Sequence, residues 1–175
     1  MADNFETIKC PACQKEMHKV FVPSQGINLD VCLDGCGGIY FDNREFTAFD
    51  EKHEPMEEIV DVLGKKEFTK VDGSLPRSCP VCGAKMVKNY ASVKKEVQID
   101  ECYACGGKFL DYGELGKIRV QYENELERSA DTLRVLYDTV GMELKALDEE
   151  NARLERERSW LKRFFDKLVG MNSRI

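Results

Sequence analysis

The sequence predicts a small α+β protein in which two tandem copies of a metal-bound hairpin unit precede a long C-terminal helix. Three observations lead to this fold class. The stretch CGGIYFDNREF at residues 36–46 returns as CGGKFLDYGEL at residues 105–115, so the chain builds one unit twice. Each copy contains two closely spaced cysteine pairs. After the second copy, an apolar residue recurs every seven positions, which is typical of a coiled-coil helix.

The composition limits the class of protein. A chain of 175 residues with 42% hydrophobic content is long enough for one ordinary domain, or for two very small ones with an extension. The cysteine content is too low for a disulfide scaffold and the N-terminus has no apolar stretch, so we expect a cytoplasmic protein. We expect no membrane span. A net charge of −6 argues against a general phosphate-binding surface.

The eight cysteines form two sets of two pairs, with 18 residues between the pairs in the first set and 19 in the second. This is the spacing of a zinc ribbon, because each pair makes a tight turn that offers two thiolates and a hairpin brings the turns together. We therefore predict two structural sites that bind two zinc ions per chain. The predicted ligands are Cys10, Cys13, Cys32 and Cys36 in the first site, and Cys79, Cys82, Cys102 and Cys105 in the second.

Other interpretations of the cysteines are disulfides, a redox motif, or buried free thiols. A thioredoxin-like pair opens a helix, whereas these pairs flank segments with the composition of short strands. Those segments are 17–22, 27–31, 86–90 and 97–99. Iron bound as in rubredoxin uses similar turns, and the spacing leaves that metal open. His18 and His53 are spare donors that we expect to be exposed or structural.

A glycine pair follows the last cysteine of each set. Backbone N–H groups approach the sulfurs at this point and positive φ is often needed, which glycine permits without steric cost. A third short strand is predicted next, at 39–41 and 108–110. Each Asp-x-x-Glu then predicts a capping box, with aspartate as the N-cap of a helix and glutamate as its third residue. The two boxes are Asp42 with Glu45 and Asp111 with Glu114.

This pattern resembles the bacterial transcription-factor zinc-finger family, whose ribbons are similar to that of transcription factor IIB. The family pattern is Cys-Pro-x-Cys, a hairpin, Cys-x-x-Cys-Gly-Gly, an aromatic-aliphatic pair, and Asp-x-x-Glu-Leu. Residues 79–118 match it closely. Residues 10–49 match with two departures, since three residues separate Cys32 from Cys36 and Phe46 replaces the leucine.

Two further residues depart from the family pattern, because Tyr40 and Phe109 stand where the family commonly has tryptophan. The resemblance implies zinc binding and suggests contact with nucleic acid or the transcription machinery. A closed site of four cysteines has no open position for a substrate, so each zinc is expected to be structural. We expect loss of Cys105 to unfold the second ribbon and to leave the first largely intact.

The predicted organisation has four parts. They are a first zinc ribbon with a following helix at 1–54, a connector at 55–78, a second zinc ribbon at 79–118, and a long helix and candidate coiled coil at 119–170. Within the connector, a helix is expected at 56–63.

No nucleophile, base and orienting group converge in the sequence. We therefore predict no enzyme activity, no small-molecule substrate and no cofactor besides zinc.

The long helix carries a heptad pattern with seven apolar d positions, whereas its a positions are only half apolar. The alternative is that this stripe packs on the chain's own ribbons. Residues 119–150 hold 4 basic and 9 acidic side chains, and residues 151–175 hold 7 and 3, which favours antiparallel pairing. Asn151 at an a position favours parallel pairing instead. The d positions are Leu126, Leu133, Val140, Leu147, Leu154, Leu161 and Leu168.

Two functions are compatible with this sequence. The first is a non-enzymatic adaptor or assembly protein, with a protein partner or self-association through residues 122–168. The second is a regulator associated with nucleic acid or the transcription machinery. The net charge does not favour this role, but two features support it: a lysine-rich second hairpin and the basic, aromatic segment 153–167. A thiol redox switch is a third hypothesis that no feature selects. The hairpin lysines are Lys85, Lys88, Lys94 and Lys95.

Overall fold

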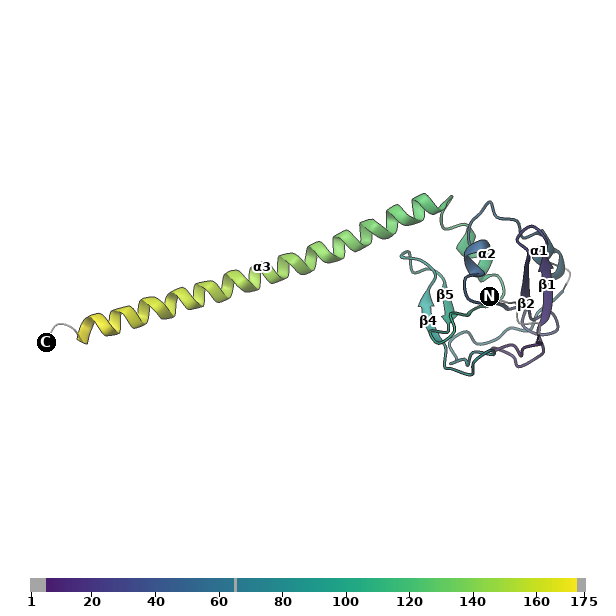
Figure 1. Cartoon of the computed structure of the whole chain (residues 1–175), viewed down its shortest axis with the longest axis horizontal. Helices are drawn as coiled ribbons and strands as arrows, with labels where there is room; N and C mark the ends of the chain where they lie inside the picture. Colours follow the sequence, from purple (N-terminus) through teal and green to yellow (C-terminus); the bar gives the residue numbers. More distant parts are fainter. Residues whose placement is uncertain (1–5, 65, 173–175) are drawn as a thin grey trace. The chain divides into compact units, whose positions relative to one another are not determined.

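The computed structural model describes residues 6–64 and 66–172, the residues from 165 onward by their backbone alone. The chain forms two compact units, which meet between Ala130 and Asp131. The first unit contains all the strands and the short helices, and the second consists of most of one long helix (Figure 1). Within the described ranges, no helix has both the length and the apolar character needed to cross a membrane.

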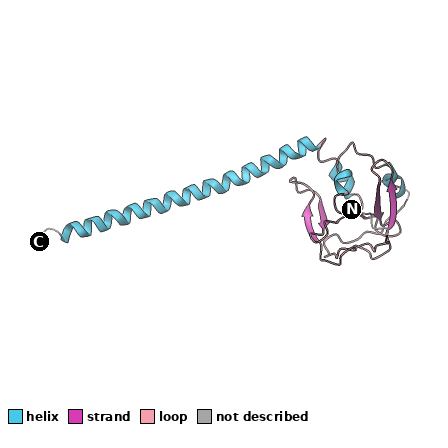
Figure 2. Ribbon diagram, viewed as in Figure 1, coloured by secondary structure: helices cyan, strands magenta, loops and turns pink. Residues whose placement is uncertain are grey.

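The first unit is built on one antiparallel sheet of six strands, in the order β1-β2-β3-β6-β5-β4. Its two outer hairpins, β1–β2 and β4–β5, are the magenta strand pairs on either side of this unit (Figure 2). The strands lie within one or two residues of the predicted segments, because alternating apolar residues between metal turns and glycines determine them locally. Their bounds are β1 His18–Val22, β2 Ile27–Val31, β3 Ile39–Phe41, β4 Val87–Tyr90, β5 Gln98–Glu101 and β6 Lys108–Leu110.

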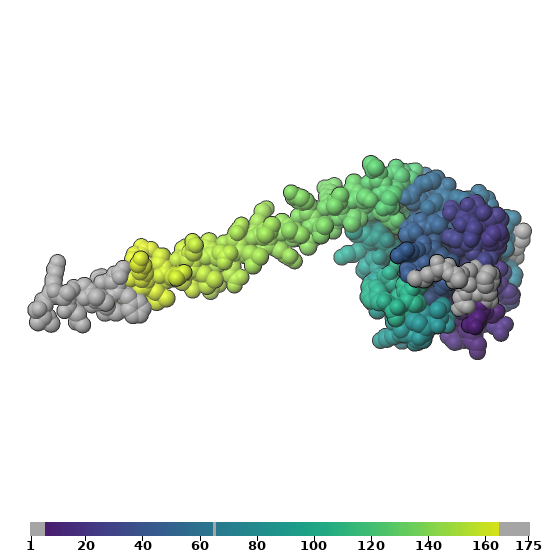
Figure 3. All heavy atoms as spheres, viewed as in Figure 1, coloured from purple at the N-terminus to yellow at the C-terminus, as the bar shows by residue number. Residues whose placement is uncertain are grey.

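The two ribbons are joined through their third strands. β3 pairs with β6 antiparallel, and Tyr40 lies directly opposite Phe109 in that pairing. Since these two residues occupy the same position in the repeat, the pairing relates the ribbons by an approximate two-fold axis. In the space-filling view the first ribbon, purple to blue, and the second ribbon, teal, meet in one continuous mass (Figure 3). The sheet therefore belongs to both repeats together.

The hydrophobic core is shared in the same way. Its larger cluster takes fully buried side chains from the first ribbon, such as Leu29 and Phe41, and from the second, such as Leu110. Helix α1, Glu57–Leu63, lies in the connector where a helix was predicted, and its Ile59 is fully buried in this cluster. A core that neither ribbon completes alone is expected for modules of about 40 residues, which bury too little surface by themselves.

The predicted capped helices require a correction. The glutamate half of each box forms, because Glu45 and Glu114 each accept a hydrogen bond from the backbone N–H of the aspartate three residues earlier, at 2.8 and 2.7 Å. In the first ribbon, however, only a 3₁₀ turn follows, η1 Phe46–Ala48. In the second, helix α2 spans Glu114–Arg119 and begins after Gly113, so Asp111 is not its N-cap.

Helix α3, Glu125–Asn172, is one continuous helix of 48 residues, about 72 Å at 1.5 Å per residue. Its six described d positions, from Leu126 to Leu161, are 44–83% exposed. The side chains at positions 165–168 lie outside the described residues. They include Phe165 at an a position and Leu168 at a d position of the heptad pattern, and the end of the basic segment 153–167. The long helix thus presents an exposed apolar row.

Candidate metal centres

The structure brings the eight cysteines into two groups of four, and in each group all four sulfurs lie within 4.8 Å of one another. The sequence placed the same residues together. The members are Cys10, Cys13, Cys32 and Cys36 in the first cluster, and Cys79, Cys82, Cys102 and Cys105 in the second. His18 and His53 stand outside both clusters, paired with Asp34 and Glu51 respectively.

Each cluster is held by two backbone turns. In three of the four turns, the residue four positions after the first cysteine donates a backbone hydrogen bond to the carbonyl oxygen of that cysteine. One example is the bond from the Gly106 N–H to the Cys102 carbonyl, at 2.7 Å. The fourth turn contains the extra residue, and there Gly37 donates to Cys32 from five residues away, at 3.0 Å. Gly37 and Gly106 adopt φ of +73° and +82°, which confirms the conformation predicted for the glycine pair at its first residue. The second residue of each pair, Gly38 or Gly107, does not have positive φ.

Gly35 explains how the longer turn is accommodated. A Cβ atom at this position would lie 2.6 Å from the sulfur of Cys13 and 2.7 Å from that of Cys32. Any larger residue would therefore occupy the space between two thiols of the first cluster. The inserted residue keeps the four-sulfur geometry only because the turn contains a glycine.

The sulfur positions fit a tetrahedral zinc ion. Neighbouring sulfurs lie 3.4 Å apart for Cys10 and Cys36, and 3.4 Å apart for Cys82 and Cys102. Four thiolates at the usual Zn–S bond length of about 2.3 Å stand roughly 3.8 Å from one another. Binding of zinc would thus move each sulfur by only a few tenths of an ångström, and four sulfurs would close the coordination sphere.

The pKa values of the cysteine thiols also favour the binding of a cation by each cluster. Hydrogen bonds with Cys10 and Cys36 lower the pKa of Cys32 to about 2, whereas the hydrogen bond with Cys32 raises the pKa of Cys10. In the second cluster, burial acts to raise the pKa of Cys102, but hydrogen bonds from the backbone of Cys105 and Ala104 and with the Cys82 side chain together outweigh it and lower that pKa to about 7. Without a cation, only part of each cluster ionises, since neighbouring thiolates repel one another. A divalent cation removes that repulsion.

The second glycine of each pair makes room for an aromatic ring of the opposite ribbon. A Cβ on Gly107 would lie 1.9 Å from the hydroxyl oxygen of Tyr40, and a Cβ on Gly38 would lie 2.3 Å from Cζ of Phe109. Both rings are fully buried. The aromatic position of the repeat, to which the sequence assigned no role beyond a strand, therefore interlocks the two ribbons.

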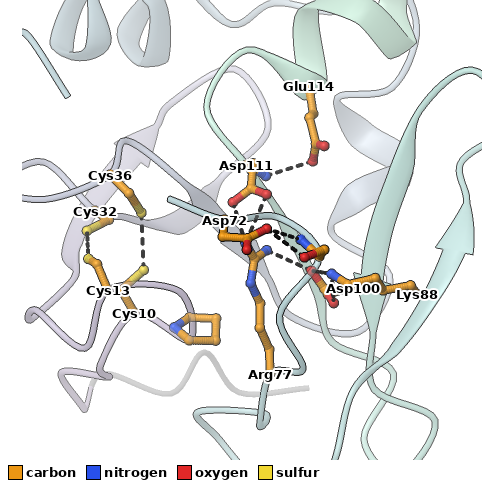
Figure 4. A network of polar contacts seen from close by, with 12 residues as sticks. Cys10, Cys13, Cys32, Cys36, Asp72, Arg77, Lys88, Asp100, Asp111 and Glu114 are labelled. Carbon is orange, nitrogen blue, oxygen red and sulfur yellow. Dashed lines mark hydrogen bonds and ion pairs between the residues drawn. The ribbon is translucent and has the colours of Figure 1, made fainter. Parts of the chain in front are cut away.

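Arg77 forms the main buried ion-pair network of the second ribbon (Figure 4). Its side chain is 3% exposed and donates to Asp100 at 2.7 Å and to both carboxylate oxygens of Asp111 at 2.8 and 2.9 Å. Burial opposes the charge of Arg77, but the Asp111 and Asp100 carboxylates outweigh it and raise the pKa of Arg77. Arg77 thus takes the carboxylate that the sequence assigned to helix capping, and no local motif pointed to it.

We expect Asp111→Asn to destabilise the first unit by about 2 kcal/mol, because a charged hydrogen-bond partner of a buried guanidinium is lost while Asp100 remains. Zinc content should stay at two ions per chain. A double-mutant cycle with Arg77→Met, followed by denaturant unfolding, measures the coupling between the two side chains. Additive effects of the two substitutions would show that Asp111 acts on the helix instead of on Arg77.

These features define a class of protein: a tandem zinc-ribbon protein with two closed four-cysteine sites and two zinc ions per chain. Residues 9–49 and 78–119 each match the family described as Transcription factor zinc-finger, and the two segments are zinc ribbons of that family. No curated protein and no solved structure matches the chain.

Proposed function

We propose that this chain is a non-enzymatic zinc-binding adaptor, in which the joined ribbons contact a protein partner and α3 associates with a second copy. The exposed apolar row of α3 is the observation that carries the proposal. Single exposed leucines are ordinary on a protein surface, but a row at heptad spacing over more than 35 residues is an association surface.

The structural role of zinc supports a function without catalysis. Four sulfurs close each site, so neither ion would have a coordination position for substrate. A pocket of about 290 Å³ lies beside Cys36, between the connector and the second ribbon. Of its lining residues, Cys36 is a ligand of the first metal site and the Asp111 carboxylate is paired with Arg77. The other lining residues are Phe68, Thr69, Lys70, Val71 and Tyr112.

The charges of α3 favour an antiparallel pair of identical helices. An antiparallel arrangement sets the acidic segment 119–150 beside the basic segment 151–175 of the other copy. In a parallel pair, Glu150 would instead face Glu155 of the second copy, and like charges at such positions are unfavourable. The same chain therefore supplies both complementary surfaces, which is why a second copy is the proposed occupant.

Replacing both Leu147 and Leu154 with aspartate should dissociate this pair, because unpaired carboxylates would be placed in the middle of the apolar seam. Sedimentation equilibrium at tens of micromolar should show a wild-type dimer and a monomeric double mutant, with two zinc ions retained in both. The matched control is Ala146→Asp with Ala152→Asp, which adds the same two charges outside the seam and should remain dimeric.

Orientation is tested by cross-linking carboxylates to amines in dimers of labelled and unlabelled chains. Antiparallel pairing should link Lys162 to an acidic residue between 123 and 131 of the other copy, whereas a link to Glu157 would indicate parallel pairing. A wild-type monomer in the sedimentation experiment would contradict self-association. A double mutant that stays dimeric would place the interface on the ribbons.

Contact with nucleic acid or the transcription machinery is the second candidate, and the description of the matching family supports it. Two of the four hairpin lysines make contacts within the chain. Lys88 pairs with Asp100 at 2.9 Å, and Lys94 lies 3.9 Å from the ring centroid of Tyr122. Fluorescence anisotropy with DNA and RNA oligonucleotides at two salt concentrations tests this candidate, since phosphate binding weakens steeply as salt rises.

A further inference from the structure

Tyr40 belongs to the first ribbon but contacts the metal cluster of the second. Its hydroxyl oxygen lies 3.2 Å from the sulfur of Cys79 and 3.8 Å from that of Cys105. The side chain is fully buried. An O–H group at these distances from two sulfurs is within hydrogen-bonding reach of both, and a thiolate accepts such a bond because it carries negative charge.

The position of this hydroxyl is set by the backbone of both ribbons. Tyr40 and Phe109 face each other where β3 pairs with β6, and the bare backbone of Gly107 lies against the Tyr40 hydroxyl. Phe109 occupies the equivalent position in the second ribbon and packs in the same way against Gly38. Because phenylalanine has no hydroxyl, it has no donor to offer the first cluster.

We propose that Tyr40 is a positioning residue of the second zinc site, so that the first ribbon completes the metal centre of the second. Its hydroxyl donates to the Cys79 thiolate, which disperses negative charge on the sulfur and holds that ligand in place. Outer hydrogen bonds of this kind commonly change metal affinity 10–100-fold. The two sites are therefore coupled, and the coupling acts equally in both directions.

Tyr40→Phe is the direct test, because it removes the hydroxyl and keeps the buried ring. The zinc-loaded protein is titrated with a chelator, and cysteine alkylation followed by peptide mass spectrometry reports zinc release at each site separately. We expect the affinity of the second site to fall about 10–100-fold, with a smaller change at the first. Tyr112→Phe is the matched control, since it deletes the hydroxyl of an exposed tyrosine, and it should leave both sites unchanged.

A second readout separates a contact with the metal site from a general loss of stability. In protein loaded with cadmium-113, NMR correlation to the cysteine Hβ protons assigns each metal resonance to its ligands. Tyr40→Phe should shift the resonance correlated with Cys79 and Cys105 and leave the other in place. Unchanged affinity at the second site, or equal weakening of both sites without that selective shift, would overturn the proposal.

The coupling has its own test. Cys13→Ser, which damages the first site, should weaken zinc binding at the second site in the wild-type background. In the Tyr40→Phe background the same substitution should have a smaller effect, because the hydroxyl that links the sites is already absent. An equal effect in both backgrounds would show that Tyr40 does not carry the coupling.

Discussion

Replacing Cys105 with serine is expected to remove one zinc ion, to unfold the second ribbon and to loosen the first. A structural zinc site contributes on the order of 10 kcal/mol to folding, which is comparable to the whole stability of a small domain. The sequence alone led us to expect an intact first ribbon. That expectation changes because β3 of the first ribbon is hydrogen-bonded to β6 of the second.

Elemental analysis and amide hydrogen exchange test this result together. Zinc should fall from two ions per chain to one, and the amides of residues 39–41 should lose protection although they lie in the unmutated ribbon. Cys13→Ser is the reciprocal control, and it should expose residues 108–110 in the same way. Wild-type protection at 39–41 in Cys105→Ser would show that the ribbons fold independently.

Gly107→Ala is expected to have the second-largest effect, a destabilisation of about 3 kcal/mol measured by denaturant unfolding with zinc in excess. The added methyl group would lie 1.9 Å from the Tyr40 hydroxyl and 2.6 Å from the carbon that bears it. Tyr40 is fully buried and cannot swing into solvent, so the β3–β6 pairing must shift to relieve the clash. Overpacking of a filled core generally costs 1–3 kcal/mol, and this contact is unusually close.

Gly116→Ala is the matched control, because Gly116 lies within α2 and an added Cβ there would meet nothing within 4 Å apart from its chain neighbours and the backbone of its own helix. It should be neutral or stabilise the helix by up to about 1 kcal/mol. Combining Gly107→Ala with Tyr40→Ala should cost less than the sum of the two single changes, since the missing ring leaves space for the methyl group. If Gly107→Ala is as mild as Gly116→Ala, the ribbons are not interlocked by this contact.

The departures from the sequence-based interpretation involve residues whose partners are distant in the chain. Asp111 has the spacing of an N-cap, yet its carboxylate binds Arg77, 34 residues earlier. The first ribbon has the same Asp-x-x-Glu but forms only a 3₁₀ turn after it. A capping box describes what a short peptide favours by itself, and a buried guanidinium offers the carboxylate a stronger partner.

The sequence by itself determined the local structure of this protein: the paired metal turns, the strands between them, the glycines with positive φ and the long helix. Each depends on contacts within a few residues or on the periodicity of one segment, and both can be recognised from the sequence. Only the tertiary structure decided that β3 and β6 join the ribbons into one sheet, and that Tyr40 lies against the sulfurs of the other cluster. The unpaired backbone groups at the edge of a strand can form hydrogen bonds with many different strands, so the sequence of that strand does not identify its partner. The partner is decided by how the buried side chains of both ribbons pack together.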